Sequence, residues 1–413
     1  MRSKNYKQTV FACCISYITQ AIVVNFPPLL FLRFQNQFDV SLSELSTLIS
    51  ICFGAELIVD LLAAKFSTLF SQRVLIITSQ ILAIAGIAGF GIFPFIFSNG
   101  FIGLAIADIL CGIGGGLMEV LVSPIIEACP TDSKSGSMSF LHAFYCWGQA
   151  AVILLTTLFF FVLGIDNWRI TAFLWTIIPI ASIIMFTFVP IYDDPSKTAE
   201  KNGEQAKPAS LIIILKNKMF LAFMVIMICA GASELAMSQW ASSFAEAGLG
   251  VSKAAGDIFG PCLFAIFMGT ARLIYGKFGA KADSYLCMII SSGICAASYL
   301  LAAFSPIAAL SLFGCALCGF SVGILWPGTL SIAAERIHGG VAMFALMALG
   351  GDIGCLVGPA LVGKIADMFG GDIRISFIFS LAFPAIMIVS LILLRHGDKK
   401  RKKSAAARAE CEE

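Results

Sequence analysis

The residues of this sequence that could do chemistry are ionisable groups placed inside long apolar runs. Six acids and one histidine occupy such positions: Glu56, Asp60, Asp108, Glu119, Glu234, Asp352 and His142. Charge is costly in an apolar layer, and burial and mutual repulsion both favour the protonated form of a carboxyl group. No Lys or Arg is expected deep in the same runs. The pattern therefore predicts carboxyl groups that take up and release a proton, or that bind a cation.

Glu119 is the first candidate for this coupling role. It lies 11 positions after Asp108, which places the two acids about 20° apart around a helix and predicts one acidic stripe facing a cavity. For Glu119 the alternative is a hydrogen bond to a neighbouring helix, and for Asp108 it is contact with water at the outer end. Glu234 and Asp352 are the next candidates. His142 titrates near neutral pH and could relay protons, although a packing role is the alternative.

Amide and aromatic side chains in the same runs predict the surface that a solute would meet. Sugar hydroxyl groups need hydrogen-bond partners, and sugar C–H faces pack on aromatic rings. We expect a small neutral polar solute, a monosaccharide or oligosaccharide, in a pocket lined by Gln20, Asn25, Tyr145, Trp147, Gln239, Trp240 and Trp326. Tryptophan also binds cations, so a proton-driven exporter of lipophilic cations is the alternative.

The elements that must position these residues are membrane-spanning helices. Only 13% of the 413 residues are charged, 59% are hydrophobic and the mean hydropathy is +0.92, whereas about 25% of a soluble protein is charged. A helix of about 20 apolar residues spans the hydrocarbon layer. The sequence predicts an all-α membrane protein with twelve such helices, near 9–32, 45–68, 74–97, 101–128, 138–163, 169–191, 219–245, 255–275, 284–304, 307–333, 341–366 and 374–394.

The distribution of basic residues predicts the orientation of these helices. With both termini inside the cell, 22 of the 27 Lys and Arg residues fall in cytoplasmic segments and 5 in outer loops, as the positive-inside rule requires. We therefore expect a multi-pass protein of the cell membrane with both termini in the cytoplasm. The basic tail near 399–403 could contact anionic lipid headgroups.

Two pseudo-symmetric six-helix bundles are predicted from an internal repeat. A shift of 207 residues aligns Cys111, Gly112 and Gly116 with Cys318, Gly319 and Gly323, and parallel repeats are common in secondary transporters. The glycine spacing is typical of close helix packing. The expected divisions are an N-terminal bundle (1–191), a cytoplasmic linker (192–218), a C-terminal bundle (219–395) and a basic tail (396–413).

A membrane-embedded enzyme is the hypothesis from another class. The loops are short, and no cluster of nucleophilic or metal-ligating residues stands at a predicted membrane surface. We therefore expect no enzyme activity, no cofactor, no metal site and no nucleic-acid partner. The expected partners are a small-molecule solute, a proton or sodium ion and the lipid bilayer, and the expected state is a monomer.

Several short motifs resemble those of the major facilitator superfamily. The run from Gly276 to Lys281 resembles the cytoplasmic gating motif of that family, which implies gating roles for Lys277 and Lys281. Glu56 and Asp60 are an acidic pair four residues apart that could form part of a cytoplasmic gate, pair with Lys65 or act in transport. Further motifs resemble the fucose, galactose and glucose symporter branch: Glu119 with Ser123-Pro124, Gly231-x-x-Glu234 followed by Trp240, Gly351-Asp352-x-Gly354 with Gly358-Pro359, and His142-x-Phe144-Tyr145.

This resemblance implies a sugar carrier in which Glu119 exchanges a proton as the solute binds. Two positions depart from the branch pattern. Pro27-Pro28 stands where the fucose carriers have an acid, and Asp108 stands where many proton-driven members have an arginine. Glu234 and Asp352 could supply the second coupling site, or sodium could replace the proton.

Overall fold

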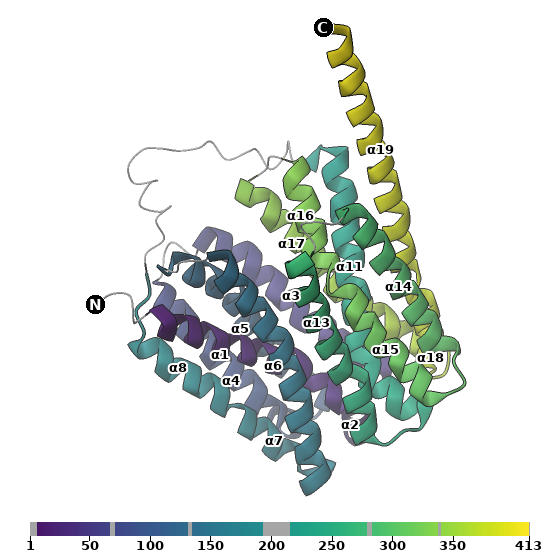
Figure 1. Cartoon of the computed structure of the whole chain (residues 1–413). Helices are drawn as coiled ribbons and strands as arrows, with labels where there is room; N and C mark the ends of the chain where they lie inside the picture. The colour runs from purple at the N-terminus through teal and green to yellow at the C-terminus, as the bar shows by residue number, and fades with distance from the viewer. Residues whose placement is uncertain are drawn as a thin grey trace.

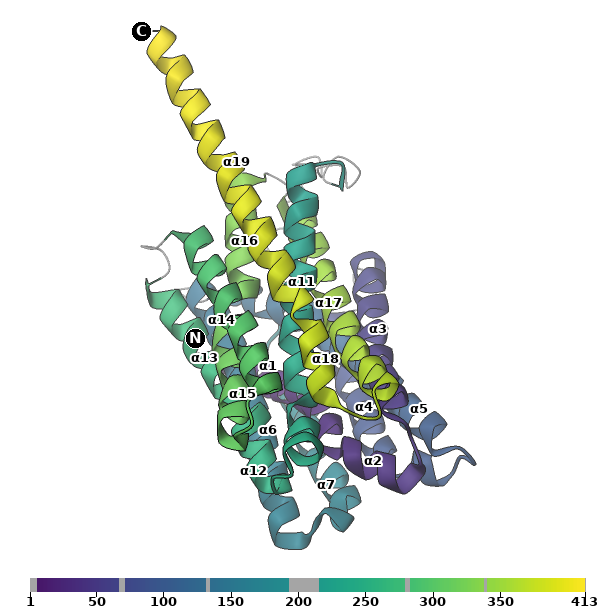
Figure 2. The same ribbon diagram turned by 90° about the vertical axis from the view of Figure 1, so that its right-hand side faces the viewer.

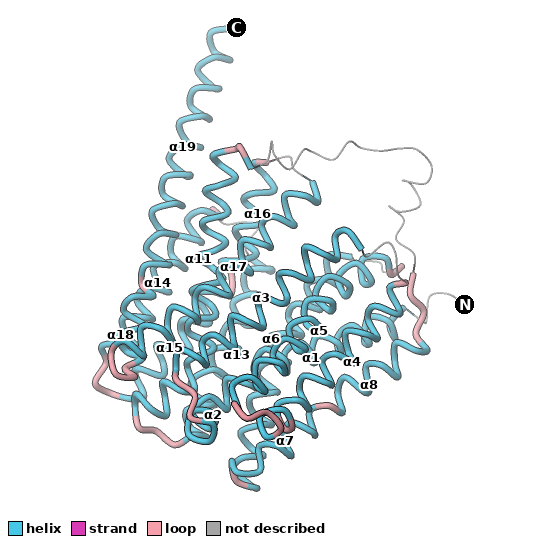
Figure 3. Tube along the Cα trace, turned by 180° about the vertical axis from the view of Figure 1, so that it is seen from behind, coloured by secondary structure: helices cyan, strands magenta, loops and turns pink. Residues whose placement is uncertain are grey.

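The chain is built from membrane-length helices, as the sequence predicts. The computed structural model describes residues 6–66, 71–130, 134–192, 215–278, 283–337 and 340–412. Within these ranges twelve helical segments are long and apolar enough to cross a membrane, and all the regular elements are helices (Figure 3). The protein is therefore a multi-pass membrane protein.

The first six segments form the N-terminal half. Their elements are α1 (Tyr6–Asn25), η2 (Pro27–Leu30), α2 (Phe31–Phe38), α3 (Leu42–Phe66), α4 (Gln72–Phe90), η3 (Phe93–Phe95), α5 (Gly100–Ala128), α6 (Lys134–Leu163), η4 (Ile165–Asn167), α7 (Trp168–Trp175) and α8 (Ile177–Phe188). The predicted linker lies largely outside the described residues.

The last six segments form the C-terminal half. Their elements are α11 (Lys218–Ser243), η5 (Phe244–Gly248), α12 (Lys253–Asp257), η6 (Ile258–Cys262), α13 (Leu263–Phe278), α14 (Ser284–Phe304), α15 (Ala308–Val322), α16 (Leu325–Arg336), α17 (Gly340–Met368), α18 (Ile373–Ser380) and α19 (Ala382–Glu412). Helix α19 continues without a break beyond the predicted end of the last span and projects from the bundle (Figure 2).

Proline explains two interruptions of these segments. Proline has no backbone N–H to donate to the preceding turn. At Pro27 and Pro28 the first segment changes to a tight 3-10 turn between α1 and α2. Pro261 lies in the π-helical turn η6, which joins α12 to α13. Both interruptions lie near the contact between the two halves, where they turn the chain without ending the span.

The repeated glycines are packing positions, as the small-residue spacing predicts. A Cβ atom at Gly112 of α5 would collide with the Cys52 carbonyl group of α3, and one at Gly319 of α15 would collide with the Phe264 carbonyl group of α13. The two repeats thus make equivalent helix pairs, α3 with α5 and α13 with α15. The internal repeat of the sequence is therefore also a repeat of backbone contact.

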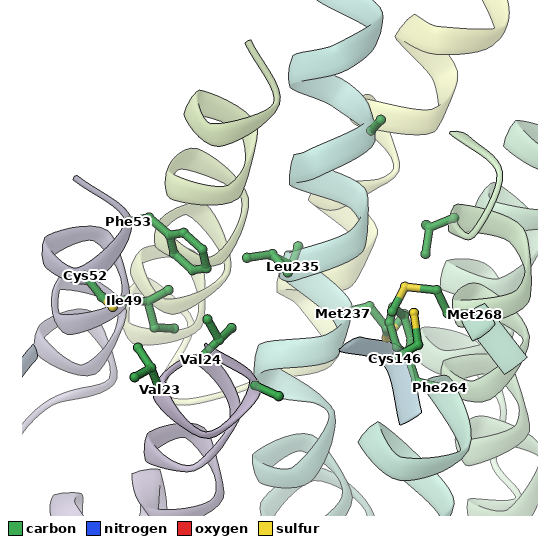
Figure 4. Packing of buried hydrophobic residues seen from close by; sticks show 14 of the residues in the cluster. Val23, Val24, Ile49, Cys52, Phe53, Cys146, Leu235, Met237, Phe264 and Met268 are labelled. Carbon is green, nitrogen blue, oxygen red and sulfur yellow. The ribbon is translucent and has the colours of Figure 1, made fainter. Parts of the chain in front are cut away.

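The two halves meet at the end of the molecule opposite the projecting part of α19, which we call the closed end (Figure 1). Helix α3 packs on α17 there, where the Ser43 N–H donates to Asp367 Oδ2 at 2.8 Å. Gln239 Nε2 of α11 donates to the Val24 carbonyl oxygen of α1 at 3.2 Å. The apolar core is continuous across this contact, and Val24, Phe53 and Leu235 face one another from the two halves (Figure 4).

We predict that Gly112→Ala lowers the free energy of unfolding by about 1–3 kcal/mol, because the added methyl group meets backbone that cannot move away without separating α3 from α5. Gly293→Ala is the matched control. A Cβ there meets nothing within 4 Å, and alanine favours a helix by about 1 kcal/mol over glycine. Thermal unfolding of both purified variants in detergent measures the difference. Equal melting temperatures for the two variants would contradict the packing role.

Candidate functional site

Acidic side chains from both halves converge around Cys355 of α17. Four carboxyl groups act electrostatically on its thiol: Asp352 on the same helix, Glu234 on α11, Glu119 on α5 and Glu56 on α3. Three of them, Glu234, Glu56 and Glu119, also act on Tyr145 of α6. The predicted coupling residues Glu119, Glu234 and Asp352 therefore surround one region between the halves.

Glu119 is the acid of this group that reaches water. Its side chain is exposed although it lies in the middle part of α5. It acts electrostatically on Tyr17, which is itself buried and shares a side-chain hydrogen bond with Ser123. The rings of Tyr17 and Tyr145 pack edge to face with centroids 6.2 Å apart. Because Glu119 also acts on Cys355 of the other half, its exposure indicates that the space between the halves is open to water at this level.

Glu234 has a basic partner, which corrects the expectation that no Lys or Arg lies deep in a span. Arg272 of α13 places Nη2 at 3.8 Å from Glu234 Oε2, with side chains that are 22% and 16% exposed. The same guanidinium group donates from Nε to the Gly323 carbonyl oxygen at 3.3 Å and from Nη1 to Cys146 Sγ of the N-terminal half at 3.3 Å. The sequence assigned Arg272 to the cytoplasmic end of its helix, but its long side chain extends back into the bundle.

Asp108 does not share the environment of Glu119, although both lie on α5. Asp108 is buried and lines a small pocket at the closed end, together with Pro27, Pro28 and Gln239. It acts electrostatically on Cys52 and Cys111. The two acids of the predicted stripe therefore lie in different environments: Glu119 is exposed, whereas Asp108 is buried at the closed end.

The predicted solute-lining residues separate into two groups. Tyr145 and Trp326 are partly exposed near the acids, and the Trp326 ring lies against Gly351, next to Asp352. Trp240 is fully buried and donates from Nε1 to the Pro359 carbonyl oxygen at 3.1 Å. Trp147 is 46% exposed, and its ring lies next to Gly269 of α13 in the other half.

The three predicted amide residues are all buried and each makes a hydrogen bond. Asn25 Nδ2 donates to the Ala21 carbonyl oxygen at 2.9 Å within α1. Gln239 reaches α1 at the closed end, as described above. Gln20 Nε2 donates to Glu56 Oε1 at 2.9 Å. Gln20 is thus the amide residue that contacts one of the converging acids.

Some predicted residues cannot be placed. The side chains of His142, Asp60 and Lys277, and the whole of Lys281, lie outside the described part of the structure. Their predicted relay and gating roles stay predictions.

A charged network at the closed end was missed by the sequence analysis. Asp257 is fully buried, and its Oδ1 atom accepts hydrogen bonds from Lys253 Nζ at 2.7 Å and from Ser242 Oγ at 2.5 Å. Its Oδ2 atom accepts one from Thr157 Oγ1 of the N-terminal half at 3.0 Å. The Lys253/Asp257 spacing of four residues on a helix could have indicated the pair. This network joins α6 to α12 across the two halves.

The comparisons with known proteins agree with this architecture. A family model described as Major Facilitator Superfamily matches residues 9–343 and 262–410. The chain belongs to the Major Facilitator Superfamily. The resemblance that the sequence motifs indicated is thereby confirmed at the level of the superfamily, and the twelve-helix fold with it.

Individual members of the superfamily are distant in sequence. The chain is 24% identical over 363 residues to the membrane protein MosC of Rhizobium meliloti, covering 88% of this chain and 84% of that protein. Its fold matches a D-xylose-proton symporter with a TM-score of 0.78 at 12% identity, covering 94% and 97% of the two chains. It also matches the fucose:proton symporter of E. coli with a TM-score of 0.62 at 15% identity, covering 94% and 99%.

We predict that Asp257→Ala lowers the stability of this superfamily member by about 3 kcal/mol, because the change leaves Lys253 without its partner in a partly buried position. The double variant Lys253→Met/Asp257→Ala should lose clearly less than the sum of the two single changes, since it removes both charges together. Denaturation in detergent of the four proteins of this cycle gives the coupling energy. Strict additivity would contradict a stabilising pair.

Proposed function

We propose that this superfamily member is a proton-coupled carrier of a small neutral polar solute, namely a sugar. The observation that carries the proposal is the convergence of acids from both halves on the region around Cys355, with Glu119 exposed there. A carboxyl group that lies between two moving bundles and reaches water can exchange a proton in one state of the cycle and be shielded in the other. The proposed reaction is transport, with no covalent step.

The charge balance of the site supports a solute without negative charge. Among the described residues around Cys355 and Tyr145, four carboxyl groups stand against the one guanidinium group of Arg272, which is already paired with Glu234. An anionic solute would meet net repulsion there. A neutral polyhydroxy compound would instead use the Arg272 N–H groups and the carboxylate oxygens as hydrogen-bond partners.

The aromatic residues near the acids support a solute with a hydroxyl-rich edge and an apolar face. Tyr145 and Trp326 are partly exposed on opposite halves of the molecule, so that both could contact one solute. Flat rings of this kind pack on the C–H face of a sugar ring. Two of the structural neighbours are named as proton symporters, one of D-xylose and one of fucose, which supports both the solute class and the proton.

In an alternating-access cycle, the contacts at the closed end hold the two halves together on that side. The bonds Ser43–Asp367, Val24–Gln239 and Thr157–Asp257 each join the two halves. We propose that they break when the molecule opens to the other side, while Glu119 and Arg272 become enclosed. With both termini in the cytoplasm, as the basic residues predict, the conformation described here faces inward.

We predict that Glu119→Gln abolishes proton-driven accumulation but retains solute exchange. One pH unit corresponds to about 1.4 kcal/mol, enough for about a tenfold solute gradient at one proton per solute. In vesicles with an imposed pH gradient, wild-type protein should accumulate a labelled monosaccharide from a panel of sugars about tenfold, and the variant should only equilibrate it. Asp166→Asn is the control, because this carboxyl group is exposed and paired with Arg33, and it is not one of the acids that converge on Cys355.

Two results would contradict the proposal. If sodium rather than a pH gradient drives uptake, the coupling ion is wrong. If the protein moves none of the sugars but exports a lipophilic cationic dye under a proton gradient, the solute class is wrong and the exporter hypothesis is correct.

A further inference from the structure

Glu56 forms a second acidic centre inside the N-terminal half. Glu56 is 5% exposed. It lies on α3, which packs against α5, and α5 in turn contacts α1. Gln20 of α1 donates to its Oε1 atom at 2.9 Å. A Cβ atom at Gly115 of α5 would collide with Glu56 Oε1 and would lie 2.8 Å from Gln20 Oε1. The glycine therefore provides the space in which the carboxyl and carboxamide groups meet.

The carboxamide of Gln20 can serve either protonation state of Glu56. An ionised carboxyl group only accepts hydrogen bonds, and the Gln20 Nε2 group supplies a donor. A protonated carboxyl group also donates, and Gln20 Oε1 is a buried acceptor with no hydrogen-bond partner among the described residues. A rotation of the carboxamide or the carboxyl group would join these atoms. Burial of a polar group is costly unless it is hydrogen-bonded, so this pair holds a proton or releases it at low cost in both states.

Glu56 acts on the same side chains as the buried acid Asp108 and as the other acids that converge on Cys355. On one side it acts electrostatically with Asp108 on the thiols of Cys52 and Cys111. On the other side it acts with Glu119 and Glu234 on Tyr145, and with these two and Asp352 on Cys355. Among the described residues, the basic group in this neighbourhood is Arg272, which acts on Tyr145 and is paired with Glu234.

The helices that carry Glu56 and Gln20 also carry contacts between the halves. Val24, one turn beyond Gln20 on α1, accepts the hydrogen bond from Gln239. Ser50, on α3 before Glu56, donates from Oγ to the Leu356 carbonyl oxygen of α17 at 3.4 Å. A change in the Glu56–Gln20 bond therefore alters two helices that both hold the closed end together.

We propose that Glu56 is a second residue that must carry the same coupling proton during the transport cycle, with Gln20 as the residue that positions it. This inference rests on the proposed function, since it adds a residue to the same coupling machinery. The proton binds at a Glu56 carboxylate oxygen and leaves from it, while Gln20 changes between donating through Nε2 and accepting through Oε1. No covalent bond to carbon, nitrogen or sulfur changes.

The decisive variant is Glu56→Gln in vesicles loaded with the transported sugar. It should retain sugar exchange, lose the pH dependence of that exchange, and reduce accumulation under one pH unit from about tenfold to about onefold. Gln20→Leu is a second variant that keeps the carboxyl group but removes its donor. Its exchange should show a pH profile moved to higher pH, because the ionised form of Glu56 loses a hydrogen bond.

Gln80→Leu is the matched control. Gln80 is an equally buried carboxamide of the same half, but its Nε2 atom bonds to Ser16 Oγ at 2.7 Å rather than to an acid. This variant should keep the wild-type pH profile even if its stability falls. Wild-type accumulation and an unchanged pH profile in Glu56→Gln would overturn the inference and assign Glu56 a structural role.

A second readout separates this inference from the proposed function. Spin labels on the two halves at the closed end report their separation as a function of pH without any solute. A pH-dependent change in wild type that is absent in Glu56→Gln supports the role of Glu56 even if no sugar is transported. A pH-dependent change with the same midpoint and size in Glu56→Gln as in wild type overturns it.

Discussion

The cost of placing a carboxyl group at membrane depth is the physical constraint on which the rest of this structure depends. An acid there needs a basic partner, a hydrogen-bond donor, a proton or water. The structure provides a different solution at each of four positions. Glu234 has Arg272, Asp257 has Lys253, Glu56 has Gln20, and Glu119 is exposed to water. The first two solutions fix charge in place, whereas the last two allow the number of protons to change.

Close packing at glycines keeps the helices within each half together while the two halves move relative to each other. Within each half, α3 with α5 and α13 with α15 approach so closely that a side chain at Gly112 or Gly319 would collide with backbone. The contacts between the halves include hydrogen bonds and apolar side chains at the closed end. They also include the approach of Gly363 on α17 to α3 and the bond from Arg272 to Cys146. Each half is thus rigid inside and joined to the other by bonds that can be exchanged, which suits rocking of one bundle against the other.

Most of the fold was predictable from the sequence, because the physical signals are strong. Twelve apolar runs are long enough to span a membrane, and backbone groups in lipid must bond within a helix. The repeated Cys-Gly motif near Gly112 and Gly319 predicted both the internal repeat and the close packing. The acids Glu119, Glu234 and Asp352 were also found, since a charge in an apolar run stands out.

Side-chain direction and reach could not be predicted from one-dimensional spacing. Arg272 was counted as a cytoplasmic residue because its Cα atom lies near the end of a span, but its guanidinium group bonds within the bundle. Asp257 was missed because it follows a short polar segment; it ends the short helix α12, directly before the π-helical turn, and is fully buried. Trp240 and Trp147 were assigned to the solute pocket by residue type, and the sequence could not show that Trp240 is fully buried whereas Trp147 is exposed next to Gly269 of the other half.

The most direct test of the account is to record proton movement when solute moves without any imposed gradient. A sugar that the protein transports is added to vesicles of purified protein in a weak buffer without sodium, and the external pH is followed. The account predicts that the external solution becomes more alkaline as sugar enters, in proportion to the amount of sugar taken up. Sugar entry with no change in external pH would contradict the claim that carboxyl groups between the halves carry the coupling proton.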